Sequence, residues 1–428
     1  MSQHGHEQII IAAIPARLPR RLVVSLSVFI AVGLMALIVG ASGEQALRTW
    51  QIFLVNFLVW SGIGLAGVVF AAILHVTDGR WAGPIRRLAE STGAFLPISY
   101  VAFLLFCIGG QALLPGTRQP LGSPDKAAWL APRFLLWRDA MALLVLAGVS
   151  WVFLYHSLRQ DVGLAAERGY RRPGKINQWL IANWKGIDVE RARARRILSL
   201  VSPLLLILYA YLFSLLAYDL VMSLAVDWYS NLFGLQFFMT NLYVGLAAIA
   251  IITLVARRHL GLEAYVTVAQ LHDVGKLLFA LAAFWAYLTF THYLVIWYGN
   301  VPEETAYLIR RAHEAPWSFV ALIVVAFCFL VPFIGLLGRE PKRRPWVLLS
   351  ISAIIMIGVL LERFLLIAPS LWHERDLPLG ILEVLITGGF AGAFALSVLM
   401  FLRAFPALPL ADLTIYGGVH QPVNAPTP

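Results

Sequence analysis

The chain has 428 residues, of which 60% are hydrophobic and only 13% are charged, and its mean hydropathy is +0.77. A soluble protein of this size could not bury so much apolar surface, so the composition excludes the soluble classes and predicts an integral membrane protein. The net charge of +10 would indicate nucleic-acid binding in a soluble protein. Here we attribute it to basic loops at a membrane surface and expect no nucleic-acid partner.

Ten apolar stretches follow one another, each of about twenty residues and long enough to cross a ~30 Å hydrocarbon core as a helix. They predict a single all-α membrane domain over 22–405. A cytoplasmic N-tail (1–21) precedes it, and a Pro-rich C-tail (406–428) follows, which we expect to lie extended on a partner or to be disordered. The predicted spans are 22–40, 53–75, 94–113, 140–158, 197–217, 232–256, 275–297, 318–337, 346–367 and 379–402.

Lysine and arginine are distributed unevenly between alternate loops. Most of the 33 basic residues fall in the N-tail and in the loops after the even-numbered spans, the largest group lying in the loop 159–196. Loops rich in lysine and arginine stay on the cytoplasmic side, so both termini are predicted to be cytoplasmic. We expect these loops to contact anionic lipid.

The second and sixth spans contain matching runs, GLAGVVFAAIL at 64–74 and GLAAIAIITLV at 245–255, which align without gaps. Each is followed by a short loop with an acid and a glycine and then by an aromatic-rich span. Trp137 and Trp317 stand just before the fourth and eighth spans. The pattern predicts two four-helix bundles, spans two to five (53–217) and six to nine (232–367), flanked by spans one and ten. The alternative is that small residues only let neighbouring helices approach closely.

Ionisable residues gather toward the predicted periplasmic ends of the spans. A charge at the bilayer centre costs roughly 2.5–3.5 kcal/mol, so such groups need partners and often mark a function. Adjacent helical residues such as Glu362 and Arg363 do not face each other, so we expect each to have a partner on a neighbouring helix. Each residue could instead be a helix cap, a headgroup contact or a tie between helices. Together they could pass protons or bind a quinol head group. This candidate proton or quinol cluster contains Asp139, Tyr218, Asp219, His292, Glu304, Glu362, Arg363 and Glu383.

A smaller group lies at the predicted cytoplasmic ends and is a candidate site of proton uptake. The one acid of this group, Asp273, could instead cap the helix of the seventh span. No Cys-x-x-Cys motif or paired Cys/His spacing occurs, so we expect this chain to bind no metal and no redox cofactor itself. The group contains His75, His156, His272 and Asp273.

The segment after the seventh span predicts a structured cap. A Gly-Asn turn at 299–300 precedes Pro302, which suits the first turn of a helix. Two glutamates at 303–304 favour the N-terminal end of that helix, and two arginines at 310–311 favour its C-terminal end. We expect a short helix here that covers a site or docks a partner.

Three stretches carry a family resemblance: AYDLVMSL at 217–224, LHDVGK at 271–276 and FWAYLTFTHYLVIWYGNVPEET at 284–305. They resemble the NrfD-like integral membrane subunits, and are most similar to the ActF-type subunit of alternative complex III, over nearly the whole chain. The resemblance implies a quinol:electron-acceptor oxidoreductase of the bacterial inner membrane, with cytochrome c or a similar acceptor.

The resemblance also implies the partners of this chain. They are a second NrfD-like membrane subunit, a periplasmic iron–sulfur subunit and c-type haem subunits, with quinol or menaquinol as the substrate of the complex. For this chain it implies a framework, with proton conduction or a quinol-binding surface as further roles, and no catalysis on its own.

Two other functions fit the same spans. A secondary transporter also uses internal repeats and buried charges, although its site usually lies at mid-membrane on broken helices. A passive scaffold subunit would use its polar groups only to hold helices and partners together.

Overall fold

The structure is a computed structural model that describes residues 19–118, 121–167, 174–372, 374 and 376–411. These residues form helices and no strand, and ten of the helical segments among them are long and apolar enough to cross a membrane. The prediction of an all-α, multi-pass membrane protein is therefore confirmed. Residues 1–18 of the predicted N-tail and 412–428 of the predicted C-tail lie outside the described residues.

The ten long segments fall where the apolar stretches predict them. Several run further, because a helix can continue through polar residues where hydropathy no longer marks it. Thus α8 and α10 have 36 and 34 residues, well beyond the predicted 140–158 and 197–217. The helices that make up the ten segments are α2 (Arg20–Ala41), α3 (Ala46–Val76), α4 and α5 (Gly83–Glu90 and Leu96–Gly109), α8 (Pro132–Glu167), α10 (Ile187–Leu220), α11 (Leu232–His259), α12 (Val268–Gly299), α14 and α15 (Trp317–Val325 and Val331–Gly335), α17 (Pro345–Leu371) and α18 (Ile381–Ala404).

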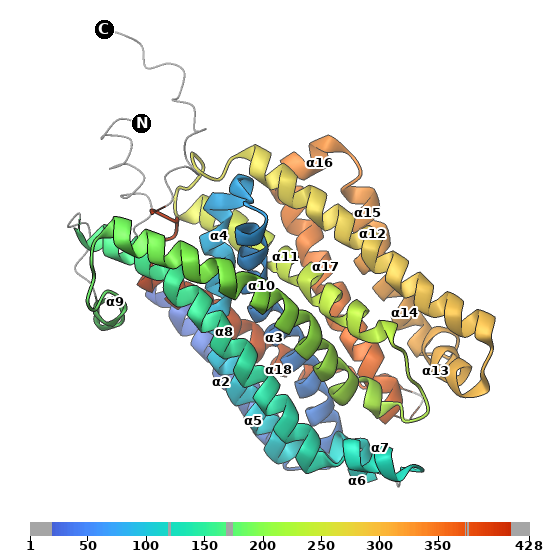
Figure 1. Ribbon diagram of the computed structural model, residues 1–428. Helices are drawn as coiled ribbons and strands as arrows, with labels where there is room; N and C mark the ends of the chain where they lie inside the picture. The colour runs from blue at the N-terminus through green and yellow to red at the C-terminus, as the bar shows by residue number, and fades with distance from the viewer. Residues whose placement is uncertain (1–18, 119–120, 168–173, 373, 375, 412–428) are drawn as a thin grey trace.

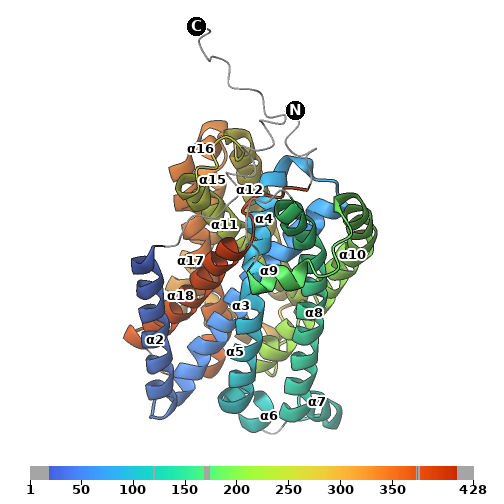
Figure 2. The same ribbon diagram turned by 90° about the vertical axis from the view of Figure 1, so that its left-hand side faces the viewer.

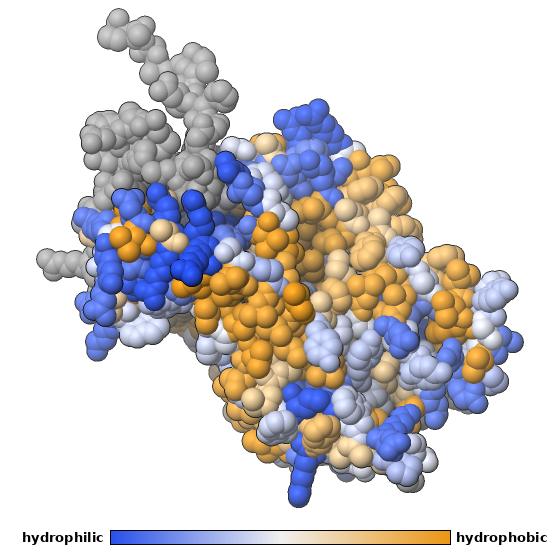
Figure 3. All heavy atoms as spheres, in the orientation of Figure 1, coloured by the Kyte–Doolittle hydropathy of each residue, from blue (hydrophilic) through white to orange (hydrophobic). Residues whose placement is uncertain are grey.

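Short helices lie at the two ends of this helical assembly. In Figures 1 and 2, α4 and α16 (Arg339–Arg343) lie at one end, whereas α6 (Pro115–Arg118) and α7 (Pro124–Trp129) lie at the other. Figure 1 places α13 (Pro302–Ala312) at this second end as well. We call these the α4 end and the α13 end. Figure 3 shows apolar side chains in a band between polar surfaces at the two ends, as expected for a protein whose middle faces lipid.

Helix α3 is the centre of the structure. Nearly all its residues are buried, and it packs against α5, α10, α11, α17 and α18. Its contact with α11 depends on small residues: a Cβ on Gly245 would lie 2.3 Å from that of Ala66, and one on Gly62 would lie 2.6 Å from Oδ1 of Asn241. The two pairs advance in the same direction along both helices, so α3 and α11 run parallel. The matching runs of the sequence therefore meet at this contact.

The packing of the other helices follows a related pattern on both sides of the contact between α3 and α11. Helices α5 and α10 pack on α3 much as α12 and α17 pack on α11, and α8 packs on α10 as α14 packs on α17. Helix α10 also contacts α11, and α17 contacts α3. Helix α2 lies at the periphery, where Gly33 meets Gly389 of α18.

Helix α12 begins earlier than predicted. It starts at Val268, and the backbone N–H of Thr267 donates to Oε1 of Gln270 at 2.6 Å. Asp273 therefore does not cap the helix, and that reading was wrong: its carboxylate pairs with Lys276 at 2.6 Å one turn further along. The start signal was the Thr267/Gln270 pair rather than the acid.

Helix α13 confirms the short helix predicted after the seventh span. It runs from Pro302 to Ala312, with Glu303 and Glu304 in its first turn and two arginines in its last. Asn300 ends α12 with a left-handed backbone (φ 47°), so the chain turns sharply between the two helices.

The segment after α18 differs from its prediction. Residues 406–411 do not extend away from the protein, because Leu408 and Leu410 are buried, with exposed fractions of 0% and 3%. The backbone N–H groups of Leu410 and Ala411 donate to Oδ1 of Asp161 on α8, at 2.9 and 2.6 Å. We call residues 406–411 the C-terminal strap. Its apolar residues cover the α4 end of the same chain.

Candidate functional site

Asp139 and Asp219 are brought together at the α13 end. Asp139 lies near the start of α8 and Asp219 in the last turn of α10, and both are almost fully buried. The two carboxyl groups lie beside each other, and neither oxygen of Asp139 has a hydrogen-bond donor among the described residues. A buried carboxyl group without a donor, next to a second carboxylate, is costly to ionise, so we expect one proton to reside on this pair. The pair is therefore a candidate site for a proton between two helices.

Arg138 forms an ion pair with Asp219 at the edge of this carboxyl pair. Its Nε and Nη2 donate to Oδ2 of Asp219 at 2.9 and 2.6 Å, and the guanidinium lies 3.9 Å from the ring centroid of Trp129. The aromatic face and the carboxylate together hold the cation at the rim of the pair. The predicted site did not include Arg138, because the sequence presents it only as one of several basic residues in a loop.

Glu362 and Arg363 of α17 form a second buried pair. Nη1 of Arg363 lies 3.6 Å from Oε2 of Glu362, so the expectation that these neighbours do not face each other was wrong. The expectation of partners on other helices is confirmed: Trp285 donates to Glu362 at 3.0 Å, and Arg363 donates to the Phe237 carbonyl at 3.1 Å and lies 3.7 Å from its ring.

Glu383 has structural partners of its own. Arg48 at the start of α3 donates to both of its carboxylate oxygens, at 2.5 and 2.7 Å, and the backbone N–H of Gly380 donates to one of them at 2.7 Å. Its oxygens are thus occupied by a bidentate ion pair between α3 and α18. This geometry favours the reading of Glu383 as a tie between helices.

Two of the remaining predicted residues of the α13 end, His292 and Tyr218, hold the segment before α11. Nε2 of His292 lies 2.9 Å from the hydroxyl of Ser230, and the hydroxyl of Tyr218 donates to the Asn231 carbonyl at 2.9 Å. Glu304 lies half-buried in the first turn of α13. The predicted cluster is therefore several separate contacts rather than one site.

A cavity of about 520 Å³ opens at the α13 end, and none of the eight predicted residues lines it. Its wall contains Trp228 stacked on Tyr307, with ring centroids 3.8 Å apart and planes 3° apart. Arg311 lies 3.5 Å from the Tyr307 ring and donates to Ser370 at 2.6 Å. Burial lowers the pKa of Arg311 to about 10 and raises the pKa of Tyr307, so at neutral pH the arginine is charged and the phenol is neutral. The cavity thus joins a flat aromatic wall to a fixed cation.

The α4 end contains a buried charge cluster that the prediction did not include. Arg87 pairs with Glu90 of its own helix and with Asp161 of α8, and all three side chains are at most 2% exposed. Nearby, Arg159 and Glu190 form a further buried ion pair at 2.8 Å between α8 and α10. The signal available in the sequence was the spacing of Arg86, Arg87 and Glu90, which places acid and base on one helical face.

The four candidates for proton uptake are not brought to one place. His75 lines a second cavity at the α4 end, which His156, His272 and Asp273 do not line. His156 packs edge-on against the neighbouring Tyr155 ring at 5.0 Å. His272 is half-exposed, one residue before Asp273 in α12.

No protein-family model matches this chain, and no curated protein sequence matches it either.

Proposed function

We propose that this chain is an integral membrane subunit of a quinol:electron-acceptor oxidoreductase in a bacterial inner membrane. The proposal is supported by the three stretches that resemble the NrfD-like, ActF-type subunits. It places the α13 end on the periplasmic side and both termini in the cytoplasm, as the distribution of basic loops indicates. It groups α3, α5, α8 and α10 into one four-helix bundle and α11, α12, α14–α15 and α17 into another, flanked by α2 and α18.

The division of work in the proposed complex follows from the chemistry of quinol. Oxidation of one quinol releases two electrons and two protons. The electrons would pass to iron–sulfur and haem c groups on partner subunits, close to a second NrfD-like subunit. This chain would supply the framework and a path for the protons.

The observation that carries the proton role is the pair formed by Asp139 and Asp219. It is buried, Asp139 has no hydrogen-bond donor among the described residues, and the pair lies at the end of the membrane domain proposed to face the periplasm. Arg138 would balance the negative charge that remains when the shared proton leaves. The pair could therefore accept a proton on one side and release it on the other without stranding a second buried charge.

Replacement of Asp139 by asparagine tests this role in the assembled complex. The amide of asparagine can still donate to Asp219, so the contact between α8 and α10 should persist while the proton can no longer leave. We expect quinol turnover and the accompanying proton release to fall at least tenfold, since a positioned proton-transfer group typically contributes a factor of about 10²–10⁴. Asp125→Asn, at an exposed acid of α7 at the same end, should leave both rates unchanged.

Two results would overturn the proposal. Full turnover and full proton release in the Asp139→Asn complex would remove the proton role. Gentle solubilisation of the native membrane that yields this chain without iron–sulfur and c-haem proteins would remove the assignment as a subunit of such a complex.

A passive scaffold is the second candidate, favoured by the ion pair between Arg48 and Glu383 and by the buried cluster around Arg87. These contacts hold helices together and offer no exchangeable proton position comparable to that of Asp139 and Asp219. Under the scaffold reading, the Asp139→Asn complex assembles and keeps all its rates.

A further inference from the structure

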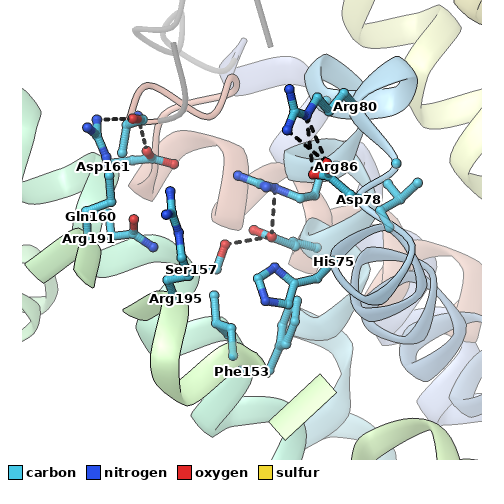
Figure 4. A pocket seen from close by; sticks show the side chains of 16 residues that line it. His75, Asp78, Arg80, Arg86, Phe153, Ser157, Gln160, Asp161, Arg191 and Arg195 are labelled. Carbon is cyan, nitrogen blue, oxygen red and sulfur yellow. Dashed lines mark hydrogen bonds and ion pairs between the residues drawn. The ribbon is translucent and has the colours of Figure 1, made fainter. Parts of the chain in front are cut away.

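The cavity at the α4 end has strongly basic walls. It encloses about 520 Å³ between the end of α3, α4, α8 and α10 (Figure 4). Arg80 and Arg86 come from the side of α3 and α4, and Arg191 and Arg195 come from successive turns of α10. Figure 4 shows Arg86 and Arg195 extending into the space from opposite walls. Four guanidinium groups therefore surround one hollow.

The acids at this cavity are already occupied. Glu90 is paired with Arg87, lies 3.7 Å from Nε of Arg86 and accepts a hydrogen bond from Ser157 at 2.7 Å. Asp78, which also lines the cavity, pairs with Arg80 at 2.9 Å. Asp161 is paired with Arg87 through one oxygen and accepts two backbone N–H groups of the C-terminal strap through the other. Three carboxylates (Asp78, Glu90 and Asp161) thus face five arginines (Arg80, Arg86, Arg87, Arg191 and Arg195), so the cavity keeps an excess of positive charge.

The two arginines of α10 keep unused hydrogen-bond donors. Arg191 donates to the carbonyl of Ala411 in the strap. Among the described residues neither Arg191 nor Arg195 lies within ion-pair distance of a carboxylate. A guanidinium has five N–H donors in a planar fork that matches two oxygens of a phosphate group. Guanidinium groups that face one another repel, and an anion between them would relieve that repulsion.

We propose that the cavity at the α4 end binds a phosphate group, held by Arg86, Arg191 and Arg195. The basic walls select the charge, and the side-chain amide of Gln160, which donates one of its two N–H groups to the His156 carbonyl, offers one further donor. Leu74, Phe153 and Leu198 line the apolar part of the same cavity. The phosphate belongs either to the headgroup of an anionic lipid or to a soluble phosphate compound, since both present the same oxygens. The inference does not depend on the proposed redox function.

The test compares two double variants of the full-length protein that carry the same net charge. Arg86→Gln/Arg195→Gln removes two arginines of the cavity. Arg193→Gln/Arg196→Gln removes two exposed arginines of α10 that do not line it. In one arm, native mass spectrometry measures how delipidated protein rebinds phosphatidylglycerol or phosphatidylcholine. In the other arm, calorimetry measures the binding of inorganic phosphate and pyrophosphate at constant ionic strength.

We expect wild type and the Arg193/Arg196 variant to bind at least tenfold more tightly than the Arg86/Arg195 variant in one of the arms. Selective binding of phosphatidylglycerol identifies the lipid headgroup as the source, and selective binding of the free phosphates identifies the soluble source. Equal weakening in both double variants would show a diffuse effect of charge and overturn the proposal, as would no binding in either arm. If the Arg86/Arg195 variant fails to fold, the single variants Arg195→Gln and Arg196→Gln decide the question in the same way, because both side chains are exposed.

Discussion

The ion pair between Arg48 and Glu383 predicts how strongly the first and last parts of the chain are joined. Arg48 donates twice to Glu383, whose side chain is 4% exposed, whereas that of Arg48 is 22% exposed. Removal of one partner of a fully buried pair costs about 3–5 kcal/mol, because the other charge remains buried. Arg48 is partly reached by solvent, so we expect Arg48→Met to lower the free energy of unfolding by about 3 kcal/mol, the lower end of that range.

The companion variant Glu383→Gln should cost less, about 1.5–2 kcal/mol, since the arginine that it leaves can reach solvent. The double variant should cost less than the sum of the two, with a coupling energy of at least ~1.5 kcal/mol. The measurement is reversible unfolding in mixed micelles of a mild detergent and dodecyl sulfate, followed by circular dichroism.

A matched control is the pair formed by Arg343 and Glu340, which is 3.6 Å apart with side chains 45% and 68% exposed. Arg343→Met should change stability by less than ~0.5 kcal/mol, as is usual for surface ion pairs. The reasoning fails if Arg48→Met costs no more than this control, or if the cycle of Arg48 and Glu383 variants is additive.

Two further predictions concern helix packing. Gly245→Ala should destabilise the protein by about 1–3 kcal/mol in the same unfolding assay, because its Cβ would overlap Ala66. Gly148→Ala is the control and should be neutral, because there is open space around Gly148. Equal effects of the two variants would contradict the close contact between α3 and α11. Tyr307→Leu should lose the stack on Trp228, worth about 0.5–1.5 kcal/mol beyond burial, and make the segment 299–316 more sensitive to limited proteolysis. Tyr307→Phe should keep the stack and the resistance, so the idea is refuted if the leucine variant is as resistant as the phenylalanine variant.

The secondary structure could be predicted from the sequence because its signals are local. The ten apolar stretches correctly predicted ten membrane-length helical segments among the described residues. Pro302 and the two glutamates that follow it correctly predicted the start of the short helix α13. The limits of α8 and α10 were not predictable from hydropathy, since polar residues continue both helices beyond the apolar region.

The site was only partly predictable because its partners are far apart in sequence. Glu383 is recognisable as an intramembrane acid, but its partner Arg48 lies 335 positions earlier. The rotation of each helix about its axis decides which residues meet, and the sequence of one helix does not specify that rotation. For this reason Asp139 and Asp219 came together, whereas His75, His156 and His272 did not line one cavity.

The C-terminal strap has a consequence for biosynthesis. Leu408 and Leu410 are among the last described residues to leave the ribosome, and both are buried at the α4 end, where Leu410 and Ala411 donate to Asp161 of α8. Helix α2, which is made early, packs on α18, the last long helix. Both contacts therefore form only after α18 and the strap have been made. Until the strap arrives, Oδ1 of Asp161 lacks its two backbone donors, so an insertion chaperone that shields this end would act before the strap is made.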